Sequence, residues 1–290
     1  MASSPDGDLA LLLVGEPVSH ALSPSLHNAA LSALFLDGEY STRQVDRLGL
    51  LDVAADLRSG LLDGVNVTAP HKAAAAGLSD ELETFAARTG SVNTWVMSDG
   101  LLVGHATDVG AISSVLERLP PDPITLLGSG GMAAAVLVAI DEHRGNDAVS
   151  MRSRSQASAI RLAESVGREV AVERWSEPVD GGVVINCSPI GLRRGERIPD
   201  RFVSGATGLL DVASGRRATM AVSAARSRKI PYADGIDLLV AQAEMSFRLW
   251  TGHPAPKGVM ERAARSREVA VRGTTIPADR DETRQQGVVQ

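Results

Sequence analysis

The stretch "ITLLGSGGMAAAVLVAI" (residues 124–140) joins a short apolar run to an alanine-rich run through a glycine turn. An apolar strand, a glycine turn and a helix in this order are typical of a dinucleotide-binding fold. Because glycine has no side chain, the glycines of the turn let the backbone approach a pyrophosphate. The positive end of the following helix attracts that pyrophosphate. The usual third glycine is Ala133 here, a variant that the pattern allows. The stretch therefore predicts a Rossmann-type domain that holds phosphates at Gly128, Ser129, Gly130, Gly131, Met132 and Ala133.

The end of the next expected strand, "VSMRSRS" (149–155), indicates which dinucleotide binds. A site for NAD normally carries an acidic residue there, about 20 residues after the glycines, to bind the ribose 2′-hydroxyl. This sequence has Arg152 and Arg154 instead, with Ser153 and Ser155 beside them. Guanidinium groups form paired, charge-assisted hydrogen bonds with phosphate oxygens. We therefore expect NADP rather than NAD, and the alternative is that both arginines are exposed loop residues.

Short apolar runs bounded by Gly, Pro or Asn alternate with stretches of helical period along the whole chain. This alternation is typical of β-α units and a mainly parallel sheet. The expected strands are residues 9–15, 39–45, 63–68, 91–97, 124–127, 146–151, 168–173, 182–188 and 205–213, and the expected helices are 24–36, 48–58, 79–88, 155–166, 234–252 and 256–269.

A chain of 290 residues is long enough for two domains, because single cores rarely grow beyond roughly 250 to 300 residues. The fold class that we predict is α/β with two domains. Residues 1–108, completed by helices within 235–270, form the first lobe, residues 109–234 form the Rossmann-type domain, and residues 271–290 form a flexible polar tail.

Composition excludes several classes of function. Residues 144–229 carry 15 basic against 9 acidic side chains, whereas residues 1–143 carry 6 against 18, so an anion would dock in the middle of the chain. Nine aromatic residues and no dense basic run argue against nucleic acid. No apolar stretch is long enough to span a membrane, which suggests a cytoplasmic protein. One cysteine and scattered histidines predict no metal site and no disulfide within the chain.

Polar residues follow several expected strands of the first lobe at the points where those strands end. "NVTAPHK" (66–72) presents Asn66 and Thr68 on one face, and a helix from Pro70 would bring Lys72 over the same edge. "SVNT" brings Asn93, and "HATDVG" brings Thr107 and Asp108 just before the next helix. Because ligands of open α/β sheets bind beyond strand ends, we expect a cleft between the lobes here.

Seven stretches in the same order resemble the shikimate dehydrogenase family, over about residues 9 to 270. They are "GEPVSHALSPSLHN" (15–28), "NVTAPHK" (66–72), "SVNT" (91–94), "TDVG" (107–110), "GSGGMAAA" (128–135), "INCSPIGL" (185–192) and "DGIDLLVAQAEMSF" (234–247). The resemblance implies reversible, NADP-dependent reduction of 3-dehydroshikimate to shikimate, with Lys72 as general acid and base and Asp108 as its partner. It implies that Asn66, Asn93 and Gln242 hold ring hydroxyls, that Ser23 and Thr68 contact the carboxylate side, and that Asp211 and Gly235 help to bind the cofactor.

The sequence departs from the family pattern in four places. Ala21 replaces the first serine of an S-x-S pair, Ala106 replaces the asparagine of N-T-D, Ser214 stands where many relatives have tyrosine, and residues 153–155 replace N-R-T. Loss of one hydrogen bond to a charged group costs roughly 1.5 to 3 kcal/mol, so two losses could change the preferred substrate. Quinate, aminoshikimate or another cyclitol acid is therefore an alternative.

Two other hypotheses, a regulator and a different dehydrogenase, fit the sequence less well. A nucleotide-binding regulator would explain the departures but not the presence of both Lys72 and Asp108, and a folate-type dehydrogenase lacks support in the first lobe. His20 and His27 are expected to be structural or to support the residues that contact the ligand. The partner that we expect is a small polyhydroxy cyclic acid, and the chain is expected to be a monomer or a homodimer.

Overall fold

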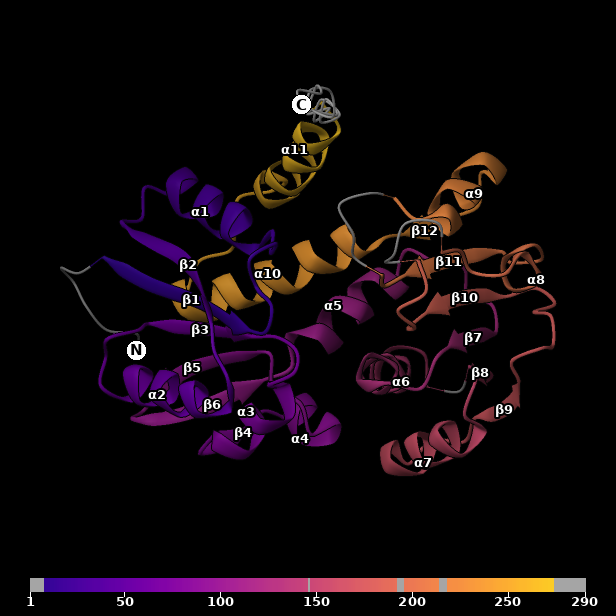
Figure 1. Ribbon diagram of the computed structural model, residues 1–290, viewed down its shortest axis with the longest axis horizontal. Helices are drawn as coiled ribbons and strands as arrows, with labels where there is room; N and C mark the ends of the chain where they lie inside the picture. Colours follow the sequence, from indigo (N-terminus) through magenta and orange to yellow (C-terminus); the bar gives the residue numbers. More distant parts are fainter. Residues whose placement is uncertain (1–7, 146, 192–195, 214–217, 274–290) are drawn as a thin grey trace, which may run out of the picture.

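The computed structural model describes residues 8–145, 147–191, 196–213 and 218–273, with side chains up to Ser266 in the last segment. Two α/β lobes stand side by side, each around a six-stranded sheet (Figure 1). The fold class is the expected one: an α/β lobe that precedes a Rossmann-type lobe.

The first sheet has the strand order β2-β1-β3-β5-β6-β4. Strands β1, β2 and β3 are parallel, and helices α1 and α2 join them along the chain. The bounds are β1 Leu9–Gly15, α1 Ser23–Ala33, β2 Gly38–Gln44, α2 Arg47–Arg58 and β3 Gly64–Val67. These elements confirm the predicted ones within a few residues.

A hairpin makes the first sheet mixed rather than mainly parallel. Strands β5 (Thr94–Ser98) and β6 (Leu101–His105) are antiparallel, and β6 was not predicted. Asp99 and Gly100 join them with φ values of 51° and 81°. Asp-Gly with both residues at positive φ is the preferred two-residue turn between antiparallel strands. The signal was therefore present in the sequence as "SDGL".

The predicted helix over residues 79–88 is wrong in its first half and confirmed in its second. The chain forms α3 (Lys72–Leu78), the two-residue strand β4 (Glu81–Leu82) and α4 (Thr84–Thr89). Glu81 and Leu82 pair with Val103 and Gly104 of β6, and the Asp80 carboxylate accepts a bond from the Leu102 backbone N–H at 2.8 Å. Pairing with a strand that the sequence did not reveal therefore interrupts the helix.

The second sheet is wholly parallel, as expected, with the order β12-β11-β10-β7-β8-β9. Helix α5 (Thr107–Leu116) leads into it from the first lobe. The bounds are β7 Ile124–Leu127, α6 Gly131–Arg144, β8 Val149–Ser153, α7 Gln156–Val166, β9 Ala171–Arg174, β10 Val183–Asn186, α8 Asp200–Val203, β11 Gly208–Asp211, α9 Met220–Arg228 and β12 Tyr232–Ala233.

Helices α10 (Gly235–Thr251) and α11 (Val259–Gly273) return the chain to the first lobe (Figure 1). Phe247 and Trp250 of α10 are buried in one core with Leu11 and Leu26. The Trp250 indole N–H donates to the Trp95 carbonyl at 2.9 Å, and its ring lies directly over Gly64, which has no Cβ to obstruct it. The first lobe is therefore completed by the C-terminal helices.

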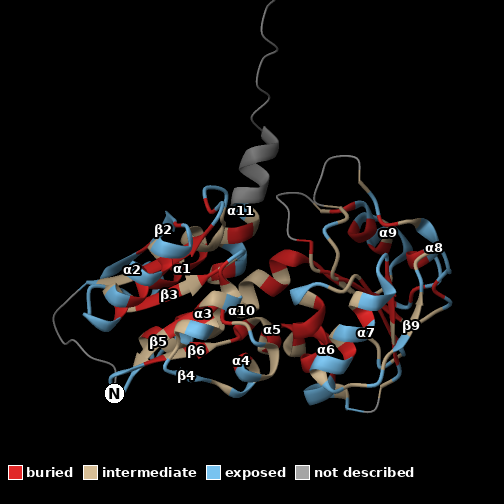
Figure 2. Cartoon of the chain, turned by 60° about the horizontal axis from the view of Figure 1, so that its bottom comes forward, coloured by how far each residue is buried: buried red, intermediate tan, exposed pale blue. Residues whose placement is uncertain are grey.

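A second apolar core continues from the first lobe into the second through α5 and α6. Both helices are mostly buried between the sheets (Figure 2). Helix α5 packs on α10 and on α6. Because one core joins the two lobes, the ends of the first-lobe strands lie opposite the glycine turn. Most of the predicted tail, residues 274–290, lies outside the described residues.

Candidate active site

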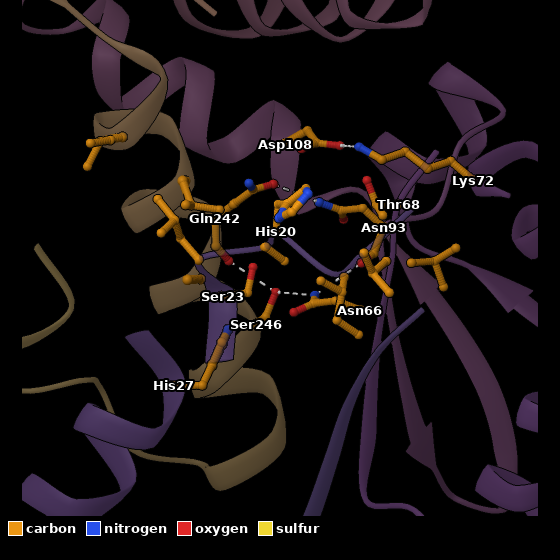
Figure 3. A pocket seen from close by; sticks show the side chains of 18 of the residues that line it. His20, Ser23, His27, Asn66, Thr68, Lys72, Asn93, Asp108, Gln242 and Ser246 are labelled. Carbon is orange, nitrogen blue, oxygen red and sulfur yellow. Dashed lines mark hydrogen bonds and ion pairs between the residues drawn. The ribbon is translucent and has the colours of Figure 1, made fainter. Parts of the chain in front are cut away.

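A cavity of about 390 Å³ lies where the first-lobe strands end, against α10 and α1 (Figure 3). Its described lining includes all seven residues predicted to hold or transform a substrate. These are Ser23, Asn66, Thr68, Lys72, Asn93, Asp108 and Gln242. Met132 of the glycine turn also lines it, so the cavity reaches the second lobe.

Lys72 and Asp108 form an ion pair at this cavity, with 2.7 Å between Nζ and Oδ2. Lys72 is the first residue of α3, and Asp108 lies in the first turn of α5 rather than before it. Their side chains are 27% and 13% exposed, so both can meet a ligand while the pair is mostly shielded from water. An amine and a carboxylate in this geometry can pass a proton to or from a bound alcohol.

Asn93 links three elements around the cavity. Its Oδ1 accepts from the Thr107 backbone N–H at 2.8 Å, and its Nδ2 donates to the Thr107 hydroxyl at 2.9 Å. The same Nδ2 donates to Gln242 Oε1 at 3.3 Å. These bonds fix the start of α5, and with it Asp108, relative to β5 and α10.

Asn66 is more fully engaged than a residue kept for substrate would be. Its Oδ1 accepts from the Tyr40 hydroxyl at 2.7 Å. Its Nδ2 faces the Asn93 carbonyl, the Thr94 hydroxyl and the Ser246 hydroxyl at 3.1, 3.0 and 3.0 Å. An amide has two N–H donors, so protein partners account for both. Asn66 lies in the cavity wall as predicted, but its contacts favour a role in holding neighbouring groups.

Two residues that the sequence analysis did not identify complete this polar network. Ser246 is buried, and its hydroxyl also lies 2.8 Å from that of Thr94. It is four residues after Gln242 and so shares a helix face with it, a spacing that could have indicated it. Tyr40 is the one buried residue in the described burial pattern of β2, and a single aromatic residue in the otherwise polar stretch "GEYSTRQ" was the signal in the sequence. Burial raises the pKa of Tyr40, and a hydrogen bond with Ser23 opposes the rise, so its hydroxyl stays protonated.

The departures from the family pattern fall in different places. Ala21 lines the cavity and offers only a methyl group where a hydroxyl was expected. Ala106 is buried at the N-cap of α5, where its own methyl side chain can make no capping hydrogen bond. Ser214 lies outside the described residues.

The glycine turn has the form that a pyrophosphate needs. Helix α6 begins at Gly131, and its N-cap, Gly130, provides no side-chain bond to the free backbone N–H groups. A Cβ added to Gly130 or Gly131 would meet no atom within 4 Å, so this surface is open. Gly128 has φ of 111°, and a Cβ there would press on the Cys187 and Ser188 backbone. The turn fits a dinucleotide phosphate by its own geometry.

Other predicted cofactor residues adjoin this turn. The Ser129 and Ser153 hydroxyls are 2.9 Å apart, and Ser155 caps α7 by accepting from the Ser158 backbone N–H. Gly235 and Met132 line a smaller cavity of about 50 Å³ that adjoins Asp108 and Gln242. Arg154 is exposed at the end of β8.

The structure counts against a direct phosphate contact from Arg152. Its side chain is 7% exposed and forms an ion pair with Glu173 on the neighbouring strand β9. It also donates to the Pro178 carbonyl at 3.0 Å. The guanidinium is therefore already engaged inside the protein, and Arg154 alone of the two is available to a 2′-phosphate.

Asp211 is likewise engaged rather than open to a cofactor. The buried carboxylate accepts from Asn186 Nδ2 at 2.8 Å, from the Ala213 backbone N–H at 3.2 Å and from the Thr219 hydroxyl. Burial raises its pKa, and these hydrogen bonds oppose the rise. Asp211 therefore ties β10, β11 and the start of α9 together.

Comparisons with known proteins place this geometry in a family. Residues 13–95 match the shikimate dehydrogenase substrate binding domain, and residues 235–265 match the shikimate 5′-dehydrogenase C-terminal domain. A relative in Dehalococcoides mccartyi, named shikimate dehydrogenase (NADP(+)), is 33% identical over an alignment of 267 residues that covers 87% of this chain and 93% of the relative. The chain belongs to the shikimate dehydrogenase family. The resemblance seen in the sequence is therefore confirmed.

Solved structures agree with this assignment to the family. Shikimate 5-dehydrogenase from Thermus thermophilus, in complex with NADP(H) and shikimate, has a TM-score of 0.78 and 29% identity and covers 89% of this chain and 99% of its own. The 5-ketofructose reductase of Gluconobacter sp. strain CHM43 has a TM-score of 0.81 at 22% identity, which shows a common fold alone.

Two kinds of feature are absent from the described residues. Within residues 8–145, 147–191, 196–213 and 218–273, no group of three or more His, Cys, Asp or Glu side chains is placed to hold a metal ion. No helix in the described part of the chain is long and apolar enough to cross a membrane.

Proposed function

We propose that this protein is an NADP-dependent shikimate dehydrogenase that interconverts shikimate and 3-dehydroshikimate. The observation that carries the proposal is the Lys72–Asp108 pair, which stands at a polar cavity between the first lobe and the glycine turn. The names of the relatives support both the reaction and the cofactor. In this proposal residues 1–108 and 235–270 hold the substrate, and residues 109–234 hold NADP.

Bound at the glycine turn, NADP would supply the acceptor for the hydride from the alcohol carbon in oxidation and the hydride donor in reduction. The protein has to move the hydroxyl proton at the same time. Lys72 takes that proton in oxidation and gives it back in reduction, while Asp108 orients the amine and can accept a hydrogen bond from the same hydroxyl. The Asn93 bonds to the start of α5 keep Asp108 in place.

Gln242 and Asn93 present donors and acceptors to the ring hydroxyls, and Ser23 and Thr68 contact the carboxylate side. Gly130, Gly131 and the free N–H groups of α6 hold the pyrophosphate, and Arg154 meets the 2′-phosphate. We place the enzyme in the cytoplasm as a monomer or homodimer.

A second candidate substrate is quinate, aminoshikimate or another cyclitol acid in the same reaction. Ala21 favours it, because the carboxylate side of the cavity has one hydroxyl fewer than the family pattern provides. A regulator without turnover is disfavoured, because such a protein has no need for an amine and a carboxylate held 2.7 Å apart at the cavity.

In the test, the purified protein is assayed with shikimate, with quinate and with aminoshikimate. Each substrate is combined first with NADP(+) and then with NAD(+). Formation of reduced nicotinamide is followed by its near-ultraviolet absorbance. We expect the largest kcat/KM with shikimate and NADP(+). A larger value with quinate or aminoshikimate would select the second candidate, and no turnover with any of the three would favour the regulator.

A further inference from the structure

Met132 is the side chain through which the second lobe reaches the substrate cavity. Among the described residues that line the cavity of about 390 Å³, it alone comes from residues 109–234. It is the second residue of α6, so it follows directly on the glycines proposed to hold the pyrophosphate. The side chain is partly buried and packs on the core that joins the two lobes. Met132 therefore connects the phosphate end of the cofactor site with the place of the reaction.

The same side chain also lines the smaller cavity of about 50 Å³. Asp108, Met132, Leu239 and Gln242 line both cavities, so these four residues form the wall between them. The smaller cavity is otherwise lined by small and apolar residues, namely Ala111, Ile112, Val212, Gly235 and Leu238. An apolar space beside a few placed polar groups suits a flat ring such as nicotinamide. From there the ring would face the alcohol held at the Lys72–Asp108 pair.

The smaller cavity is too narrow for that ring unless part of its wall moves. A volume of about 50 Å³ has room for only a few water molecules. Of the wall residues, Asp108 is held by its ion pair and Gln242 accepts a hydrogen bond from Asn93. Leu239 is branched, whereas Met132 is unbranched, has three rotatable bonds and carries a sulfur that packs well on aromatic rings. Met132 is therefore the wall residue best able to move aside for the ring.

We propose that Met132 positions the nicotinamide of the cofactor. Its thioether turns aside when NADP binds, packs on the nicotinamide ring and holds that ring toward the alcohol at Lys72 and Asp108. This rests on the proposed function, because that reaction puts the alcohol at the pair. The role belongs to the side chain and is separate from the backbone N–H groups of the glycine turn, which meet the phosphates. A change at this side chain should therefore affect the reaction more than the binding of the phosphate end.

A binding experiment on the full chain tests the contact without any turnover. Methionine methyl groups are isotope-labelled and followed by NMR while NADP(+) or 2′,5′-ADP is added, and Met132→Leu assigns the signal. The second ligand carries the 2′-phosphate but no nicotinamide. We expect NADP(+) to shift the Met132 methyl resonance, because an aromatic ring shifts a methyl group packed on its face, and 2′,5′-ADP to leave it nearly unchanged. Equal shifts with both ligands, or no shift with NADP(+), would overturn the proposal.

Met97 provides the matched control for this experiment. It is partly buried on the same core as Met132 but lies in β5 and lines neither cavity. Its methyl resonance, assigned with Met97→Leu, should stay in place with both ligands. A shift of Met97 as large as that of Met132 would contradict a local contact, because the two signals would then report a change of the whole core.

Kinetics of Met132→Ala test what the contact does. The substitution removes the thioether and leaves the backbone of the turn intact. We expect kcat for shikimate to fall about tenfold, because a ring held less firmly spends less time in position for hydride transfer, and the dissociation constant of 2′,5′-ADP to stay within about twofold. Met132→Leu, which keeps an apolar side chain of similar volume, should recover most of kcat, and Met97→Ala should keep the wild-type value.

The outcomes separate this proposal from the proposed function. If the wild-type protein oxidises shikimate and Met132→Ala keeps the wild-type kcat, the role of Met132 is overturned and the proposed function stands. If NADP(+) alone shifts the Met132 methyl group but shikimate is not oxidised, the proposed function is overturned and the contact with nicotinamide stands. If neither is observed, both are overturned. Should Met132→Ala fail to fold, the methyl resonance of the wild-type protein decides.

Discussion

The buried imidazole of His27 makes a quantitative prediction about acid stability. The unfolded chain protonates this residue near its ordinary pKa of 6.5, whereas burial lowers the pKa in the native protein to about 3. Between these two values the unfolded state binds one more proton than the native state, so stability falls as pH falls. Lowering the pH from about 7 to about 4.5 therefore removes about 2.5 kcal/mol of unfolding free energy through this one residue.

Urea unfolding of the wild-type protein and of His27→Phe, each at about pH 7 and pH 4.5, measures this contribution. Trp95 and Trp250 are both buried in the first lobe, and Trp175→Phe in both proteins removes the fluorescence of the second lobe. All other titrating groups are common to the pair. We expect the wild-type protein to lose about 2.5 kcal/mol more than His27→Phe between the two pH values. Equal losses would refute the reasoning, because His27 would then titrate alike in both states.

Three further substitutions probe other parts of the structure. Ser246→Ala removes one partner of the Asn66 amide and should lower kcat/KM for shikimate about tenfold, with the KM for NADP(+) unchanged. Steady-state kinetics that show no loss would contradict a role of the Asn66–Ser246 network in shaping the substrate cavity. Gly64→Ala places a methyl group against the Trp250 indole and should cost about 3 kcal/mol in urea unfolding, and an unchanged midpoint would contradict the close packing. Arg154→Ala should raise the KM for NADP(+) by at least about tenfold and leave the KM for NAD(+) within about twofold of wild type. An equal rise in the two KM values would show that Arg154 does not bind the 2′-phosphate.

Signals that act over short stretches of sequence predicted most of the fold. The glycine turn at 128–131, its strand and its helix are contiguous along the chain, so one local pattern predicted all three. Polar residues at strand ends predicted the cavity, because neighbouring strands of a sheet end along the same edge. Lys72 and Asp108 met as expected for this reason.

Errors arose where a partner far along the chain decided the outcome. Glu173 lies directly across from Arg152 on the neighbouring strand, and nothing local to either residue reveals that register. Asn66 looks like a free polar residue in the sequence, yet Tyr40 and Ser246, from two other segments, bind its amide. The burial of the His27 ring likewise depends on two other elements, because Tyr40 of β2 and both Phe247 and Trp250 of α10 pack around it.

The central claim is that Lys72, paired with Asp108, moves the proton of the substrate alcohol. Lys72→Met keeps the length of the side chain and removes its amine. Lys257→Met serves as the control, because Lys257 is exposed and does not line the cavity. Steady-state oxidation of shikimate by NADP(+) should show kcat lower by about 10² to 10⁴ in Lys72→Met, with the KM for NADP(+) within about threefold of wild type. A kcat equal to that of the wild-type enzyme would contradict the account.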